Sequence, residues 1–192
     1  MDMVGFESQR SDSPELTEEV QPEVVRMILS GKGFSEVSEY ISDLISQIES
    51  REMEIYKVAL PSSLGQALEE YGNTQSSRAC RYSNNHLGYD WSKGDDPWIY
   101  FIRETPPMTP GTDVLALAWD EDLPEGFELD MDATLDRALK GPLGPILREI
   151  GWRFTELKEG AQTQSAAGDW GGDWGQEETE ENKEELDNEW GW

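Results

Sequence analysis

The last 34 residues of this 192-residue chain constrain its fold more than any other stretch. Residues 159–192 contain eleven acidic residues and one basic residue, and Leu186 is their only aliphatic side chain larger than alanine. Such a segment buries too little apolar surface to offset the entropy of ordering its backbone. We therefore predict a disordered N-terminus over residues 1–19, one folded domain over 20–157 and a disordered acidic tail over 158–192.

The charge of the whole chain narrows the classes of partner. Forty-one acidic and fifteen basic residues give a net charge of −26, which repels phosphate groups and anionic membrane surfaces. We therefore expect a protein partner, no direct nucleic-acid ligand and no membrane association. No apolar run reaches the length of a membrane span, and no secretory leader is visible in residues 1–20. Cys80 is the single cysteine, which fits a reducing compartment, cytoplasmic or nuclear.

Apolar periodicity predicts two helices in the first third of the domain. One begins near Pro22 and ends at the glycines of 30–33, and a second runs from about Ser35 to Met53. The second carries a stripe close to a heptad spacing. The stripe either faces the core or is a self-association surface that would make the chain a homo-oligomer; its residues are Phe34, Val37, Ile41, Leu44 and Ile48.

The rest of the domain mixes strands with helices, so the predicted fold class is α+β. β-branched and aromatic residues predict a short strand over 55–61 and longer strands over 98–102 and 114–119, the last two pairing antiparallel. Helices are predicted over 62–71, 132–140 and 145–157, with a break at Gly141-Pro142 and a polar, turn-rich stretch over 75–94.

The sequence shows no pattern typical of catalysis or of a bound metal. Cys80 and His86, the only thiol and imidazole, lie in the polar stretch without an orienting motif, so we expect no enzyme, no cofactor and no metal. A carboxylate-rich connection follows the strand at 114–119. As an EF-hand loop starting at Asp120 it would have Pro124 and Glu125 where an oxygen ligand and glycine are required.

The acidic tail contains four of the eight tryptophans of the chain, and each is next to a glycine. They lie in two Gly-Asp-Trp-Gly units and a terminal Trp-Gly-Trp; the candidate partner-binding residues are Trp170, Gly171, Trp174, Gly175, Trp190, Gly191 and Trp192. Glycine leaves an indole accessible, and several weak indole sites on one chain raise avidity. Alternatively, the indoles fold back onto the domain, or the composition is incidental.

This tail resembles the Argonaute hook of GW/WG-repeat proteins, in which tryptophans beside glycine insert into indole pockets of an Argonaute. The resemblance is limited to the last 25 or so residues. It implies a non-enzymatic interaction protein that docks an Argonaute-like partner and modulates or suppresses RNA silencing. Two alternatives remain open: a multimeric acidic viral accessory or polymerase-cofactor phosphoprotein, and an adaptor whose acidic tryptophan motifs bind a trafficking module.

Overall fold

The first helix of the computed structural model, which describes residues 13–158, is longer than its sequence pattern suggests. α1 (Glu15–Leu29) starts directly after Pro14, so the predicted start near Pro22, and with it a disordered segment reaching residue 19, is wrong. Leu16, Val20 and Val24 recur every fourth residue and are buried. Burial of this stripe offsets the backbone hydrogen bond that Pro22 removes inside the helix.

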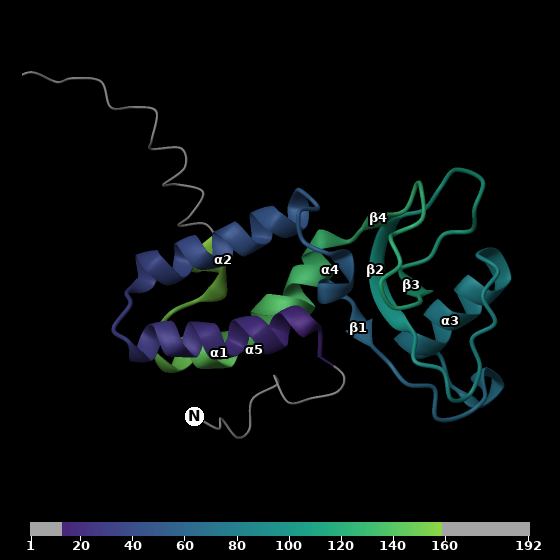
Figure 1. Cartoon of the computed structure of the whole chain (residues 1–192), viewed down its shortest axis with the longest axis horizontal. Coiled ribbons are helices and arrows are strands. Elements are labelled where there is room, and N and C mark those ends of the chain that lie inside the picture. Colours follow the sequence, from purple (N-terminus) through teal and green to yellow (C-terminus); the bar gives the residue numbers. More distant parts are fainter. Residues whose placement is uncertain (1–12, 159–192) are drawn as a thin grey trace, which may run out of the picture.

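Further helical segments complete a helical lobe with α1 (Figure 1). α2 (Phe34–Glu49) confirms the second predicted helix, and the Glu36 carboxylate accepts the Gly33 N–H at its start. α4 (Met131–Leu135), a π-helical turn (Asp136–Lys140) and α5 (Gly141–Glu149) follow one another without interruption. A last helical turn covers residues 154–158.

The predicted break at Gly141-Pro142 does not occur. A π turn is wider than an α turn, and this one places the Asp136 carbonyl oxygen where a Cβ on residue 141 would lie only 3.1 Å away. Glycine avoids that contact, and the widened turn accommodates the proline that follows. α4, the π-helical turn and α5 therefore form one bent rod beside α1.

Buried side chains join the two ends of the helical lobe through long-range hydrogen bonds. Thr17 Oγ1 donates to the Ala138 carbonyl at 2.8 Å, and Ser38 Oγ donates to the Leu157 carbonyl at 2.6 Å. The core of this lobe draws on both sequence ends of the described region, including Ile41 of α2 and Leu139 and Leu147 of the bent rod.

A four-stranded antiparallel sheet forms the second lobe (Figure 1). β2 (Trp98–Glu104) pairs with β1 (Leu60–Pro61) and β4 (Glu128–Leu129) along one edge and with β3 (Val114–Leu117) along the other. Ile99 faces Ala116 in the β2–β3 register, which confirms the predicted antiparallel pair. Of the strand predicted over 55–61, only β1 forms, because residues 55–58 adopt a 3-10 turn.

The helix of this lobe lies in the stretch that we predicted to be turn-rich. α3 (Gln75–His86) packs its buried Ala79 and Cys80 against the sheet, whereas the predicted helix over 62–71 is reduced to a 3-10 turn at Leu68–Glu70. The sequence gives no clear helical signal here, because α3 is polar overall and contacts the sheet through small side chains.

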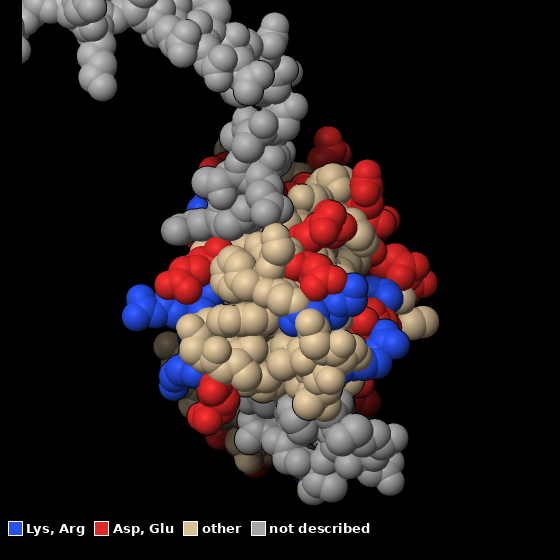
Figure 2. All heavy atoms as spheres, turned by 90° about the vertical axis from the view of Figure 1, so that its left-hand side faces the viewer, with Lys and Arg blue, Asp and Glu red and all other residues tan. Residues whose placement is uncertain are grey.

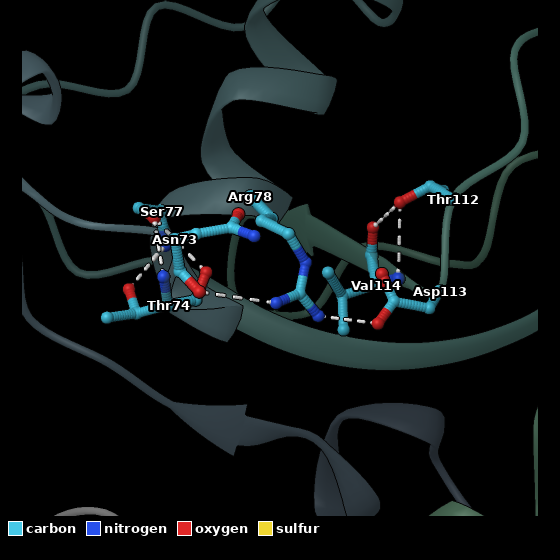
Figure 3. Close-up of polar contacts among 7 residues, drawn as sticks. All are labelled: Asn73, Thr74, Ser77, Arg78, Thr112, Asp113 and Val114. Carbon is cyan, nitrogen blue, oxygen red and sulfur yellow. Dashed lines mark hydrogen bonds and ion pairs between the residues drawn. The ribbon is translucent and has the colours of Figure 1, made fainter.

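Polar contacts fix the start of α3 to β3 (Figure 3). Thr74 Oγ1 accepts the Ser77 N–H at 3.3 Å, and the Ser77 hydroxyl accepts the Thr74 N–H in return. Arg78 pairs with Asp113 just before β3. Farther along α3, Ser83 Oγ accepts the Ala116 N–H at 3.1 Å, so a side chain satisfies a backbone donor of this edge strand.

The fold is thus α+β, as the sequence predicts. Within residues 13–158 no helix combines the length and the apolar character that crossing a bilayer requires.

Candidate functional site

The predicted tryptophan site lies outside the described residues, whereas the predicted apolar stripe lies inside them. Val37, Ile41 and Ile48 are buried in the helical core, and Phe34 and Leu44 pack half-buried against it. The stripe therefore faces the core within one chain, which is the first of the two roles the sequence leaves open.

Cys80 and His86 share α3 but not a face of it. Six residues of an α-helix turn the side chain through roughly 600°, so the two side chains point about 120° apart. Cys80 is fully buried against the sheet, and burial raises the pKa of its thiol to about 11. The His86 ring packs on Tyr82 with centroids 4.7 Å apart. A buried, protonated thiol facing away from the imidazole is not arranged as a nucleophile and base.

The carboxylates of 120–132 are spread along the connection from β3 to α4. Asp130 caps α4 by accepting the Ala133 N–H at 3.0 Å, and Asp132 lies 3.7 Å from Arg103. Glu121 accepts a hydrogen bond from the Tyr89 hydroxyl. In the part of the chain that the structure describes, no three His, Cys, Asp or Glu side chains gather as a metal would require.

One surface of the helical lobe is richer in basic than in acidic side chains. Residues 137–158 contain five basic and two acidic residues, whereas residues 13–136 contain eight basic and twenty-five acidic ones. An open hollow of about 690 Å³ lies over α5 and the turn after it. Its charged lining residues are three cations, Lys140, Arg148 and Arg153, and one carboxylate, Asp136. A second hollow beside it is lined by Lys140 and Lys158 together with the carboxylates of Asp132 and Asp136. These four cations define the basic face.

The local sequence leaves the basic face open. Gly144 contributes no side chain to the first hollow, and a Cβ there would meet nothing within 4 Å. Lys140 is paired with Asp136 one helical turn earlier, and Arg153 lies 3.8 Å from Glu156. Arg148 has no ion pair within residues 13–158. The face thus offers at least one cation without a carboxylate partner in the described structure.

Apolar side chains are exposed at the same end of the lobe. Leu29 at the end of α1 is 68% exposed and Ile150 after α5 is 39% exposed. Half-buried Trp152, which also lines the first hollow, meets Phe34 edge-on at 5.6 Å. Figure 2 looks onto this end and shows an uncharged area surrounded by basic and acidic side chains.

A shallow groove of about 460 Å³ runs along α1 toward this end. Its lining combines apolar side chains, Pro22, Val25 and Leu29, with charged ones, Glu18, Glu19, Glu23 and Arg26. Apolar side chains flanked by charged ones are typical of a surface that docks a protein segment.

Sequence reasoning missed the basic face because the net charge of the chain masks it. A count of charges in successive windows would have revealed it, since residues 137–158 carry +3 in a chain of −26. The geometry adds what counting cannot, namely that Lys140 and Arg153, thirteen positions apart, line one hollow.

Comparison with known proteins gives a fold but no family. No family model matches this chain, and no curated protein matches it. Among solved structures, the chain is similar to the family B DNA polymerase from the hyperthermophilic archaeon Pyrobaculum calidifontis, with a TM-score of 0.53 and 18% sequence identity. The match covers 69% of this chain and 17% of the polymerase chain. At this identity the likeness shows a shared fold alone.

Proposed function

We propose that this chain is a non-catalytic interaction protein that serves as an accessory factor of a family B DNA polymerase. The observation that carries the proposal is the fold shared with part of such a polymerase, over 69% of this chain. The proposal agrees with the polymerase-cofactor alternative left open by the acidic sequence.

The exposed groove on α1 supports a docking role. The matching region is 17% of the polymerase chain and is therefore joined covalently to the rest of that protein. As an accessory factor, this chain would contact a separate polymerase noncovalently. Leu29, largely exposed beside half-buried Val25, offers apolar surface for that contact.

Binding of the full chain to the family B polymerase of its source organism tests this function. We expect Leu29→Asp to weaken binding about tenfold, a loss typical of one central apolar interface residue. Met108→Asp is the matched control, because Met108 is a fully exposed apolar side chain on the sheet lobe. The proposal fails if the wild-type chain does not bind the polymerase, or if the two variants weaken binding equally.

A second candidate function follows from the tryptophans of the tail. We propose that Trp170, Trp174, Trp190 and Trp192, each directly beside a glycine, dock an Argonaute-like partner and so modulate or suppress RNA silencing. Titration of a fluorescent 160–192 peptide against a purified Argonaute tests it, with a version carrying alanine at all four tryptophans as the control. Equal affinity of the two peptides would end this candidate.

A further inference from the structure

We propose that the basic face is the docking site of this chain's own acidic tail, residues 159–192. The two surfaces are complementary in charge: the tail carries −10, and the segment that forms the basic face carries +3. The inference goes beyond both candidate functions and does not depend on which external partner is correct.

The tail leaves the described structure directly beside the basic face. Lys158, the last described residue, lines the second hollow, and Thr155 lines both hollows. Trp170 lies twelve positions after Lys158, and a stretch of that length spans at most about 40 Å. The tryptophan segments are therefore tethered within reach of the face, which gives them an effective concentration on the order of mM.

The chemistry of the face fits an acidic segment that contains indoles. Arg148 lacks a carboxylate partner within residues 13–158, and Arg153 has only a distant one at 3.8 Å. Arginine offers two kinds of contact, a hydrogen-bonded fork for carboxylates and a flat cation for aromatic rings. Half-buried Trp152 adds an apolar surface beside them.

A nucleic-acid phosphate backbone is the competing occupant. It would meet the same cations, but it must approach a chain of net charge −26, whereas the tail is already attached to that chain. The observations therefore favour the tail.

Paramagnetic relaxation in the full-length protein tests the proposal. A nitroxide label is placed at Gly172→Cys, between Trp170 and Trp174. The native Cys80 is fully buried and its pKa is raised to about 11, so it stays unlabelled in the folded protein. We expect strong broadening of the amide signals of Arg148, Trp152 and Arg153, relative to the reduced label. The broadening should be lost near 1 M salt, where the screening length is about 3 Å.

Charge reversal identifies the surface. Arg148→Glu together with Arg153→Glu should reduce the broadening several-fold, whereas the control pair Arg51→Glu and Lys93→Glu, exposed outside both hollows, should leave it unchanged. The absence of broadening in the wild type overturns the proposal, as does broadening that survives reversal at the basic face. In a further control, spin-labelled chains without isotope enrichment are mixed with isotope-enriched chains that carry no spin label. If the enriched chains are broadened as strongly as in the singly labelled protein, the contact is with a second copy, and the proposal is overturned.

A short fluorescent DNA duplex separates the two occupants. If the tail occupies the face, replacing Glu177, Glu178, Glu180 and Glu181 with glutamine should strengthen duplex binding several-fold, and Arg148→Glu should reverse the gain. If the wild-type chain binds the duplex through Arg148 and tail neutralisation changes nothing, nucleic acid is the occupant and the proposal is wrong.

Discussion

The helical lobe is assembled from two distant parts of the chain, whereas the sheet lobe is built from one continuous part. α1 and α2 lie at one sequence end of the described region and α4 and α5 at the other, with the sheet and α3 between them (Figure 1). Thr17 and Ala138, which share a buried hydrogen bond across the helical lobe, are 121 residues apart. Closing so long a loop costs conformational entropy, and only the contacts of the completed lobe offset that cost.

Because of this difference, the stability of the two lobes depends on different parts of the sequence. The helical lobe is complete only when the segment that bears the basic face has docked against α1 and α2, because Leu139, Leu147 and Leu157 supply part of its core. The sheet lobe draws its contacts from nearby sequence, mainly between α3, β2 and β3. A substitution in the helical core should therefore destabilise the whole helical lobe, whereas a substitution in α3 should affect the sheet lobe alone.

A charge in the helical core should produce the largest effect. Ile41 is fully buried, so Ile41→Glu places an unpaired carboxylate among apolar side chains at a cost of several kcal/mol. We expect the helical lobe to unfold, with loss of most helical circular dichroism. Glu39→Gln, exposed on the same helix, is the control. A folded, soluble monomer from a wild-type oligomer would instead identify the stripe as an assembly interface.

Removal of one buried donor between the two sequence ends should have an intermediate effect. Thr17→Val keeps the side-chain shape but leaves the buried Ala138 carbonyl without the hydroxyl that donates to it at 2.8 Å. The expected loss is about 1–3 kcal/mol of unfolding free energy, measured by urea denaturation. Ser46→Ala on the exposed side of α2 controls for the loss of a hydroxyl. Equal losses in the two variants would contradict a special role for the long-range contact.

Loss of the α3 cap should be smaller and confined to the sheet lobe. Thr74→Ala removes the oxygen that accepts the Ser77 N–H, at a cost of about 1 kcal/mol. Amide hydrogen exchange should accelerate in α3 and remain unchanged in α1. Thr74→Ser keeps the acceptor and should restore protection. Equal acceleration in both lobes would show that they unfold as one unit.

The smallest effect at neutral pH concerns the buried thiol of Cys80. Burial raises the pKa of this thiol to about 11 from an ordinary value of 9.0. An unfolded chain ionises the thiol first, so the stability conferred by the neutral thiol is present below about pH 9 and is lost as the pH rises toward 11. Cys80→Ala should flatten the decline in unfolding free energy over that range. Parallel pH profiles of the two proteins would contradict this assignment.

Local sequence signals predicted the elements whose pattern repeats within a few residues. The α2 stripe, the strand at Trp98 and its antiparallel partner at Val114 follow from periodicity and β-branched content. Periodicity did not predict α3, because a helix that contacts a sheet through Ala79 and Cys80 needs no large apolar stripe. The predicted break at Gly141 failed because a π turn admits the following proline.

The sequence by itself determined the α+β class and the concentration of acid and tryptophan in the last 34 residues. Only the tertiary structure showed that Lys140 and Arg153 line one hollow, and that α1 lies against the segment at 138–142. The physical reason is the range of the interactions. Periodicity and composition record which side chains a short segment offers, whereas the pairing of surfaces more than a hundred residues apart depends on how all the buried side chains fill one core.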